Sequence, residues 1–378
     1  MTGWPDARQR AHAAATPLPT DTLPLGEAVG GTLATPLVAA AAVPPFDAAA
    51  MDGYAVAGAG PWRVLRRILA GHGDPGTLTV GEAAEVATGA PVPRGAEAVL
   101  RYEDARVDGD TVAGTVPPGR HVRRTGDDCP AGASLLPAGT AVTPVVAGLA
   151  ASVGLDTLVV RQPPRVVALI TGDEVVYSGL PGHGRIRDAI GPLLPGVVAR
   201  HGAELILRLP VPDEPAAELP AAVDAAVAEV VLVCGATAAG PMDRLRAALA
   251  ELGGRPVVDG VACRPGHPQS LTILPDGRYV VGLPGNPFAA LVACHTLVAP
   301  LLAGLSGRAL AALPYAPLAG DVATGADTRL VPVRWVDRAV VPVGHDGPGS
   351  LWGAAAADAL AVLPPDWAGE PVPLLSPV

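Results

Sequence analysis

From Arg165 onward, short apolar segments alternate with segments of helical character, and this alternation constrains the fold most strongly. The segment Arg165–Thr171 (RVVALIT) is wholly apolar between its two ends. A strand with apolar side chains on both faces is typical of a parallel sheet covered by helices on both sides. The alternation continues with strands expected at 203–209, 230–234 and 279–283, and helices at 191–201, 216–228, 242–252 and 288–305. The pattern predicts a central, doubly wound, mostly parallel sheet.

Three polar turns directly follow strands of this predicted sheet. They are Thr171–Glu174 (TGDE), Cys234–Thr237 (CGAT) and the pair Gly285–Asn286. In sheets of this kind, ligands gather beyond the carboxyl ends of the strands. We therefore expect a binding site where the three turns meet.

Asn286 is the only asparagine in the 378 residues. It stands between Pro284 and Pro287, whose fixed φ angles stiffen the turn, and Gly285 can adopt conformations that other residues avoid. The amide can donate and accept hydrogen bonds, and free backbone N–H groups at the start of the following helix would attract an anion. An ordinary strand-to-helix turn without a ligand is the alternative.

The regions on either side of the α/β pattern are β-rich. Short apolar segments broken by Gly and Pro, which are typical of small β modules, occur at 81–88, 98–102 and 134–136. Two helix-like segments, 24–34 and 144–153, are expected to pack together. Further strands are expected at 330–335 and 340–343. The predicted architecture is a β-rich N-terminal region at 1–162, an α/β domain at 163–306 and a small C-terminal β domain at 307–378.

Charge and cysteine content exclude several classes of protein. The net charge of −10 and the pI of about 5.2 argue against a general binder of nucleic acid or of membrane surfaces. The four cysteines are widely spaced, which favours buried, reduced thiols over disulfides or a zinc site. The N-terminus has no apolar core of a signal peptide, and Gly and Pro are expected to break every apolar run of about 18 residues. These features predict a cytoplasmic protein.

Seven segments carry a family resemblance. They are PPFDAAAMDGYAV at 44–56, ATGAPVPRGAEAVLRYED at 87–104, VRRTGDDCPAGASLLPAGT at 122–140, ALITGDE at 168–174, RPGHP at 264–268, GLPGNPFAALV at 282–292 and GPGSLWGAAAADALAVLPP at 347–365. In this order they resemble the molybdopterin molybdenumtransferases, which insert molybdenum during synthesis of the molybdenum cofactor. The resemblance covers essentially the whole chain.

The resemblance implies a fold, an assembly and a reaction. The N-terminal region would comprise a linker domain and an inserted β-rich domain, and the C-terminal domain would resemble a β-barrel. An elongated homodimer would form its active cleft between the central domain of one subunit and the β domain of the other. The substrates would be adenylylated molybdopterin and molybdate, and AMP would be released. Cleavage of a phosphoanhydride implies Mg²⁺, and a molybdopterin adenylyltransferase is an expected partner.

The resemblance also assigns roles to individual residues. Asp52, Thr88 and Asp243 match positions tied to activity, and Asp52 and Asp243 would also hold Mg²⁺. The substrate-binding positions would be Glu174, Asp188, Asp213, Thr237, Arg264, His267, Pro284, Asn286, Pro287, Arg334 and Ser350. Simpler interpretations stand beside these roles. An acid next to a glycine can merely hold a turn, and an acid at a helix start can merely cap it.

Several positions depart from the usual family pattern. The central loop usually contains Gly-Gly-x-Ser-x-Gly, whereas this chain has Ala236 and Ala238 there, with Thr237 between them. Ile190 replaces an amide, and His267 replaces a lysine. Three hypotheses therefore remain: a molybdenum insertase, a molybdopterin-binding paralogue or scaffold without insertase activity, and a different phosphate-ester enzyme on an α/β sheet.

Overall fold

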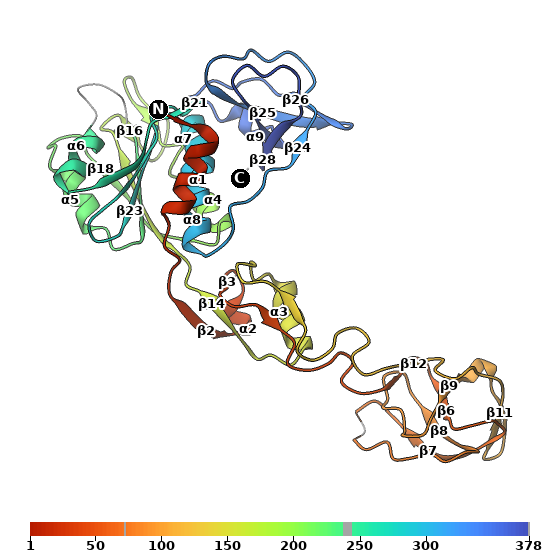
Figure 1. Ribbon diagram of the computed structural model, residues 1–378. Coiled ribbons are helices and arrows are strands. Elements are labelled where there is room, and N and C mark those ends of the chain that lie inside the picture. The colour runs from red at the N-terminus through yellow and green to blue at the C-terminus, as the bar shows by residue number, and fades with distance from the viewer. Residues whose placement is uncertain (72, 237–243, 377–378) are drawn as a thin grey trace.

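The computed structural model describes residues 1–71, 73–236 and 244–376. The chain is elongated (Figure 1): a central body and a C-terminal body lie together at one end, a small middle body follows, and a β-rich distal body forms the other end. The N-terminus lies at the central body, so the chain runs out to the distal body and then returns.

The central body is built on a six-stranded sheet. Its order is β18 (Glu204–Val211), β15 (Arg165–Thr171), β19 (Val230–Cys234), β23 (Tyr279–Leu283), β22 (Ser270–Ile273) and β20 (Arg255–Asp259). The first four strands are parallel to one another. At one edge, β22 pairs antiparallel with β23, and β20 pairs antiparallel with β22. The prediction of a doubly wound, mostly parallel sheet is confirmed.

Helices cover both faces of this sheet. Along β15, Val166, Ala168 and Ile170 belong to one hydrophobic cluster, whereas Val167 and Leu169 belong to another. This alternation is the two-residue period of a strand that is buried on both faces. The first face packs against α1 (Trp4–Ala14), α4 (Leu194–Arg200), α7 (Pro287–Ala293) and α8 (Ala299–Leu305), and the second against α5 (Glu218–Ala225) and α6 (Arg244–Glu251).

A continuous helix runs from Pro287 to Leu305 through the centre of this body. A π-helical turn, η2 (Cys294–Val298), separates α7 from α8 just before Pro300, which has no N–H to donate. Pro300 and Gly304 interrupt the apolar run in the sequence, as expected, but they do not end the helix. In the described part of the chain this helix has the length and apolarity of a membrane span, but 89% of its most apolar window is buried inside the protein.

The N-terminal helix α1 packs on this central helix, which the sequence analysis did not anticipate. The indole N–H of Trp4 donates to Thr296 Oγ1 at 2.9 Å, and Ala7 and Ala11 are fully buried. The preceding strand β1 (Thr2–Gly3) pairs with β21 (Val261–Arg264). The first fourteen residues thus lie on the central body, although they precede the β-rich region in the chain.

The middle body combines both ends of the N-terminal region. Strand β14 (Thr157–Arg161) pairs with β2 (Thr20–Pro24) and β3 (Thr32–Leu33), and α2 (Leu25–Ala28) packs against α3 (Pro144–Ser152). The expected packing of the two helical segments is confirmed. The first helix has only four residues, because Gly30, with φ 93°, and Gly31 end it. Small pairs complete this stretch: β4 (Leu37–Val38) with β13 (Ser134–Leu136), and β5 (Ala48–Ala49) with β12 (Val122–Arg123).

The distal body is a six-stranded sheet with two small cores. Its order is β10 (Arg106–Asp108), β11 (Thr111–Ala113), β7 (Trp62–Ile68), β8 (Glu82–Val86), β6 (Gly53–Val56) and β9 (Ala98–Arg101), and a 3₁₀ turn, η1 (Tyr102–Asp104), follows β9. The expected β-rich N-terminal region is thereby confirmed.

The C-terminal body is also a β-structure. Strand β25 (Thr328–Val336) pairs with β21, β26 (Ala339–Pro342) and β27 (Ala359–Leu363), and β28 (Val372–Leu375) and β24 (Tyr315–Ala316) continue the sheet. A short helix, α9 (Trp352–Ala355), precedes β27. The expected small C-terminal β domain is confirmed.

The buried histidines of the central body predict acid sensitivity. Burial lowers the pKa of His295 to about 3 and that of His201 to about 4. Between pH 4.5 and 5.5 both are neutral in the folded protein, whereas unfolded histidines with a pKa of about 6.5 are protonated. The unfolded state therefore binds more protons, and these two histidines should lower the free energy of unfolding by about 3 kcal/mol per pH unit as pH decreases.

Denaturant titrations at a series of pH values would measure this slope. The His295→Leu variant should lose about half of it, about 1.4 kcal/mol per pH unit for one proton. The exposed His183→Leu variant is the matched control and should retain the full slope. An unchanged slope in His295→Leu would contradict the assignment.

Candidate functional site

A cleft of about 630 Å³ lies at the carboxyl ends of the parallel strands. This is within the range of small-molecule sites. Its walls come from the turns after β15, β18, β19 and β23, and from Gly349 of the C-terminal body. Six of the predicted site residues line it: Glu174, Asp188, Asp213, Pro284, Asn286 and Pro287. The structure therefore brings together turns that are more than 100 residues apart in the chain.

Asn286 stands at the N-cap position of α7, with φ −79° and ψ 126°. Its side chain makes no capping hydrogen bond and has no hydrogen-bond partner among the described residues, so the exposed amide is available to a ligand. The helix start itself differs from expectation. The N–H groups of Phe288 and Ala289 donate to Pro348 O at 2.9 and 3.4 Å, and are therefore not free for an anion. They tie the C-terminal body to the cleft instead.

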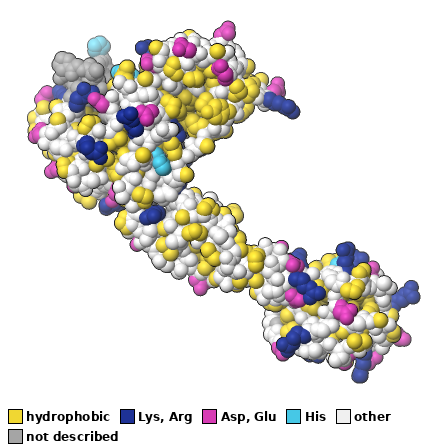
Figure 2. Space-filling model, in the orientation of Figure 1, with side chains coloured by type: hydrophobic (Ala, Val, Ile, Leu, Met, Phe, Trp, Pro, Cys, Tyr) yellow, Lys and Arg dark blue, Asp and Glu magenta, His cyan; other side chains and the backbone are white. Residues whose placement is uncertain are grey.

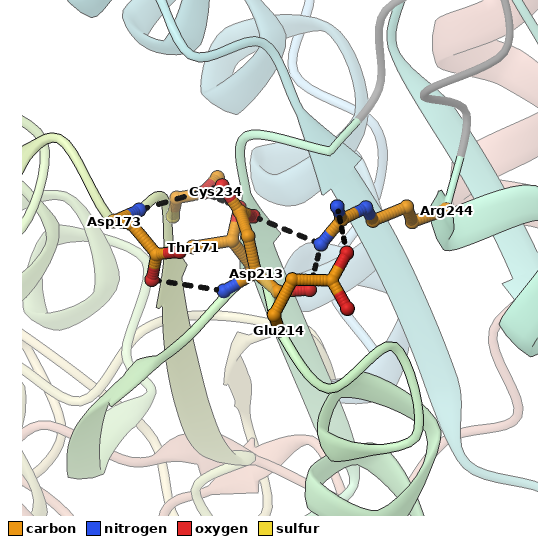
Figure 3. Close-up of polar contacts among 6 residues, drawn as sticks. All are labelled: Thr171, Asp173, Asp213, Glu214, Cys234 and Arg244. Carbon is orange, nitrogen blue, oxygen red and sulfur yellow. Dashed lines mark hydrogen bonds and ion pairs between the residues drawn. The ribbon is translucent and has the colours of Figure 1, made fainter.

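Asp213 is held by a polar network (Figure 3). The N–H of Asp213 donates to Asp173 Oδ1 at 3.1 Å, and the N–H of Asp173 donates to Asp213 Oδ2 at 3.4 Å. The Arg244 guanidinium lies 3.5 Å from Asp213 Oδ1 and also donates to Asp213 O and, at 3.0 Å, to Glu214. These contacts join the turn after β18 to the turn after β15 and to the start of α6. Asp213 is therefore fixed in the wall of the cleft by contacts within the chain.

Asp188 acts as a local cap. Its carboxylate is buried, and Oδ1 accepts hydrogen bonds from the N–H groups of Ile190 and Gly191 at 3.1 and 2.8 Å. Ile190 is buried in the central core, which explains why a hydrocarbon is tolerated at this position. Asp188 follows the short parallel pair β16 (Val175–Val176) and β17 (Ile186–Arg187). Its capping role is structural, and its other oxygen, Oδ2, accepts no hydrogen bond among the described residues.

Glu174 and Arg187 place opposite charges in the cleft. The Glu174 carboxylate folds back over Gly172, whose φ of 123° is a backbone conformation that favours glycine. Arg187 lines the cleft and is exposed, and no carboxylate in the described part of the chain pairs with it. Arg187 is not predictable from the sequence, because a single arginine in a chain without lysine carries little signal. Its position directly before Asp188 is the only clue.

Arg264 and His267 line a neighbouring hollow of about 910 Å³ rather than the cleft. The two spaces share Pro268, Pro284 and Asn286. Arg264 Nε donates to Asp327 Oδ2 at 3.2 Å, and His267 is exposed. The hollow thus extends the site towards the C-terminal body.

Of the two site residues predicted in the C-terminal body, Arg334 lies away from the cleft and Ser350 lies at its rim. Arg334 is exposed in the β25–β26 pair and lines neither space, so the structure does not bring it to the site. Arg329, which lies earlier on the same strand, lines the hollow and pairs with Asp346 at 2.7 Å. Ser350 follows Gly349 at the rim, and its Oγ accepts a hydrogen bond from the Trp352 N–H at 3.2 Å.

Asp52 and Thr88 contact each other in the distal body, at the opposite end of the elongated molecule from the cleft (Figure 1). Asp52 Oδ1 accepts from Thr88 N at 2.6 Å and from Thr88 Oγ1 at 3.0 Å. The hydrogen bond from the Thr88 backbone N–H is the main reason that the pKa of Asp52 lies below its usual value. Both residues are exposed. Within one chain they do not reach the cleft.

Two predicted residues, Thr237 and Asp243, lie outside the described residues. In the part that the structure describes, no group of three or more His, Cys, Asp or Glu side chains could hold a metal ion. The four cysteines are free and buried, as expected.

The buried Asp188 carboxylate supports a stability prediction. Asp188→Ala should lower the free energy of unfolding by about 1–3 kcal/mol, because two buried N–H groups lose their acceptor. Asp188→Asn retains an acceptor oxygen and should cost less. The exposed Glu174→Ala variant is the control and should stay within about 0.5 kcal/mol of the wild type. Equal stability of all four proteins in denaturant titrations would exclude the capping role.

Comparison with known proteins agrees with this geometry. Three family models match in order: "MoeA N-terminal region (domain I and II)" at residues 3–154, "Probable molybdopterin binding domain" at 167–304 and "MoeA C-terminal region (domain IV)" at 315–375. Molybdopterin molybdenumtransferase 2 of Mycobacterium tuberculosis is 35% identical over 340 residues, covering 85% of this chain and 83% of that protein. Molybdopterin molybdenumtransferase of Synechococcus elongatus is 34% identical over 336 residues, covering 82% of each.

Solved structures agree as well. The crystal structure of a molybdopterin biosynthesis MoeA protein from Pyrococcus horikoshii superimposes with a TM-score of 0.83 at 28% identity, covering 100% of this chain and 99% of that one. The resemblance deduced from the seven sequence segments is thus confirmed. The chain belongs to the molybdopterin molybdenumtransferase family.

Proposed function

We propose that this protein is a transferase of molybdenum cofactor biosynthesis that inserts molybdenum from molybdate into adenylylated molybdopterin and releases AMP. The observation that carries the proposal is the strand-end cleft, in which the free amide of Asn286 and the unpaired Arg187 face the same space. Both are suited to an anion, and both substrates are anions. The proposal also takes the functions in the relatives' names as those of this chain.

The cleft residues differ in which of their atoms remain free to contact a ligand. Arg187 supplies a guanidinium that can contact two oxygens of a phosphate or oxyanion at once. The Asn286 amide is held by a turn between two prolines, so it loses little conformational freedom when a ligand binds. Arg264 and His267 extend the site along the neighbouring hollow. Asp188 and Asp213 chiefly shape the turns, through the contacts described above.

A magnesium ion fits the exposed carboxylate of Asp52. The carboxylate is ionised at neutral pH, as any exposed aspartate is, and Oδ2 has no partner in the described part of the chain. We propose that Asp52 and Asp243 would hold the ion, which, when bound, would neutralise charge on the phosphoanhydride that is cleaved. Thr88 positions Asp52 through its two hydrogen bonds.

We further propose that the active unit is a homodimer. The distal body carries Asp52 and Thr88 at the opposite end of the chain from the cleft (Figure 1). A second chain could bring its distal body to this cleft, and the site would then contain both sets of residues. We also propose domain boundaries at residues 162 and 306, a cytoplasmic location, and a molybdopterin adenylyltransferase as the partner that supplies the substrate.

A paralogue that binds molybdopterin without inserting molybdenum is the second candidate, and one observation favours it. Ala236 adopts φ 55°, in the left-handed region where a glycine, usual in the family at this position, would be unstrained. The loop thus keeps a glycine-like backbone at a cost of about 1–2 kcal/mol for the alanine. His267, in place of a lysine, further weakens the positive charge next to the cleft.

Titration of the purified protein with adenylylated molybdopterin, with and without molybdate, distinguishes the two candidates. An insertase releases AMP only when molybdate is added. A paralogue without catalysis binds the substrate but releases none. Absence of binding would exclude both.

Asn286 provides a test of the anion site. Asn286→Asp nearly preserves the shape of the side chain but adds a negative charge, whereas Asn286→Ala only removes a donor. The half-saturating molybdate concentration should rise about tenfold or more in Asn286→Asp, and less in Asn286→Ala, because one unfavourable charge contact costs about 1.4 kcal/mol or more. Thermal melting should stay within a few degrees in both. Early melting together with normal molybdate dependence would make Asn286 a structural turn residue.

Mixed subunits test the shared cleft. At limiting molybdate, Asp52→Ala and Asn286→Asp proteins should each release little AMP, because each is defective in one half of the site. Mixing the two should restore part of the AMP release, since hybrid dimers contain one intact site. The readout is AMP released per chain, compared with each variant mixed with itself. A monomer in sedimentation at micromolar concentration would overturn the arrangement.

A further inference from the structure

A second cavity, of about 390 Å³, lies between the helices of the central body and the C-terminal body. It is lined by residues of α1, α4, η2 and α8 on one side and by β25, β27 and β28 on the other, and shares no residue with the strand-end cleft. The space-filling view shows the surface hollowed between these two bodies, with hydrophobic side chains gathered along the hollow (Figure 2). Nothing in the proposed reaction uses this cavity.

Arg8 brings a buried positive charge to the cavity. The residue is 7% exposed, and its guanidinium donates to the His295 carbonyl oxygen at 2.6 Å and lies 5.1 Å from the centre of the Trp4 ring. No carboxylate of the described chain lies within ion-pair distance of it. Burial lowers the pKa of Arg8 to about 10, and the group is still charged at neutral pH. A buried charge without a counter-ion is unfavourable, so this site is incomplete electrostatically.

His295 supplies a second unsatisfied group. The residue is 6% exposed, and its Nε2 atom is buried without a hydrogen-bond partner in the described structure. Buried polar atoms almost always have a partner, so an orphaned imidazole nitrogen beside a cavity indicates a missing one. His201 and Arg200 line the same space from α4. Among the described residues of the lining, Asp358 has the single carboxylate, and its Oδ2 already accepts from Trp335 N at 2.8 Å.

The remaining wall is apolar. It is made mainly of small and aliphatic side chains: Ala299, Pro300, Ala303, Leu310, Leu313 and Leu374. A compact inorganic anion would leave this wall without contacts. From the geometry, we propose that the cavity binds a small organic acid, with its carboxylate at Arg8 and His295 and its apolar part against this wall.

Benzoate is a suitable probe, because it combines a carboxylate with a compact apolar ring. Calorimetry and thermal melting of the full chain at constant ionic strength should show one benzoate per chain and a melting temperature that rises with benzoate concentration. Neutral benzamide has nearly the same shape and should bind at least tenfold more weakly. Inorganic phosphate should not raise the melting temperature beyond the effect of sodium chloride.

Two variants test where benzoate binds. Arg8→Leu should weaken benzoate binding at least tenfold, while its melting temperature without benzoate should equal or exceed that of the wild type, because an unpaired buried charge is removed. Arg10→Leu, on the same helix, is the matched control. Arg10 is half exposed and pairs with Asp6 at 2.8 Å, so its loss should leave benzoate binding unchanged.

Other outcomes would overturn the proposal. These are equal benzoate binding by Arg8→Leu and the wild type, equal binding of benzamide and benzoate, and a response to phosphate alone. If Arg8→Leu fails to fold, Ala311→Trp decides, because Ala311 is exposed and lines the cavity, and a large side chain there should block it. Unchanged benzoate binding in Ala311→Trp would place the ligand elsewhere.

Discussion

The burial of one apolar helix, Pro287–Leu305, against the central sheet holds the functional end of this protein together. Phe288, Leu297, Leu301 and Leu302 are fully buried along it, and burying each such side chain contributes about 1.5–3 kcal/mol. Helix α1 packs on the same central helix. The Pro348 carbonyl oxygen accepts hydrogen bonds from the first turn of that central helix. The position of Asn286 is therefore set by the buried helix that begins directly after it.

The polar residues around the cleft serve two different purposes. Asp188 and Asp213 hold the backbone of neighbouring turns, and their hydrogen bonds are largely satisfied within the chain. The side chains of Arg187 and Asn286 and the Oδ2 atom of Asp52 have no hydrogen-bond partner in the described part of the chain. Free donors and acceptors at an exposed site are those that a ligand can use, whereas satisfied ones maintain its shape. This distinction separates ligand-binding candidates from structural residues better than residue type does.

The elongated shape has a functional consequence. A narrow middle body separates the distal body from the central one, so the two halves of the proposed site cannot meet within a single chain. If two chains share the site, the separation itself makes activity depend on dimer formation. The cavity at Arg8 lies beside the C-terminal body instead, and a ligand there would strengthen contacts between that body and the central helices.

Local patterns in the sequence were sufficient to predict the alternating strands and helices, the turn at Asn286 and the family. Those features depend on local periodicity and on short motifs, which neighbouring residues suffice to specify. Three-dimensional contacts were needed to show that α1 packs on the central body, that Phe288 and Ala289 donate to Pro348, and that Arg187 lines the cleft while Arg334 does not. The same is true of Arg8, which has no carboxylate partner among the described residues. These outcomes depend on contacts between residues far apart in the chain, and no local pattern encodes which distant partner a side chain will meet.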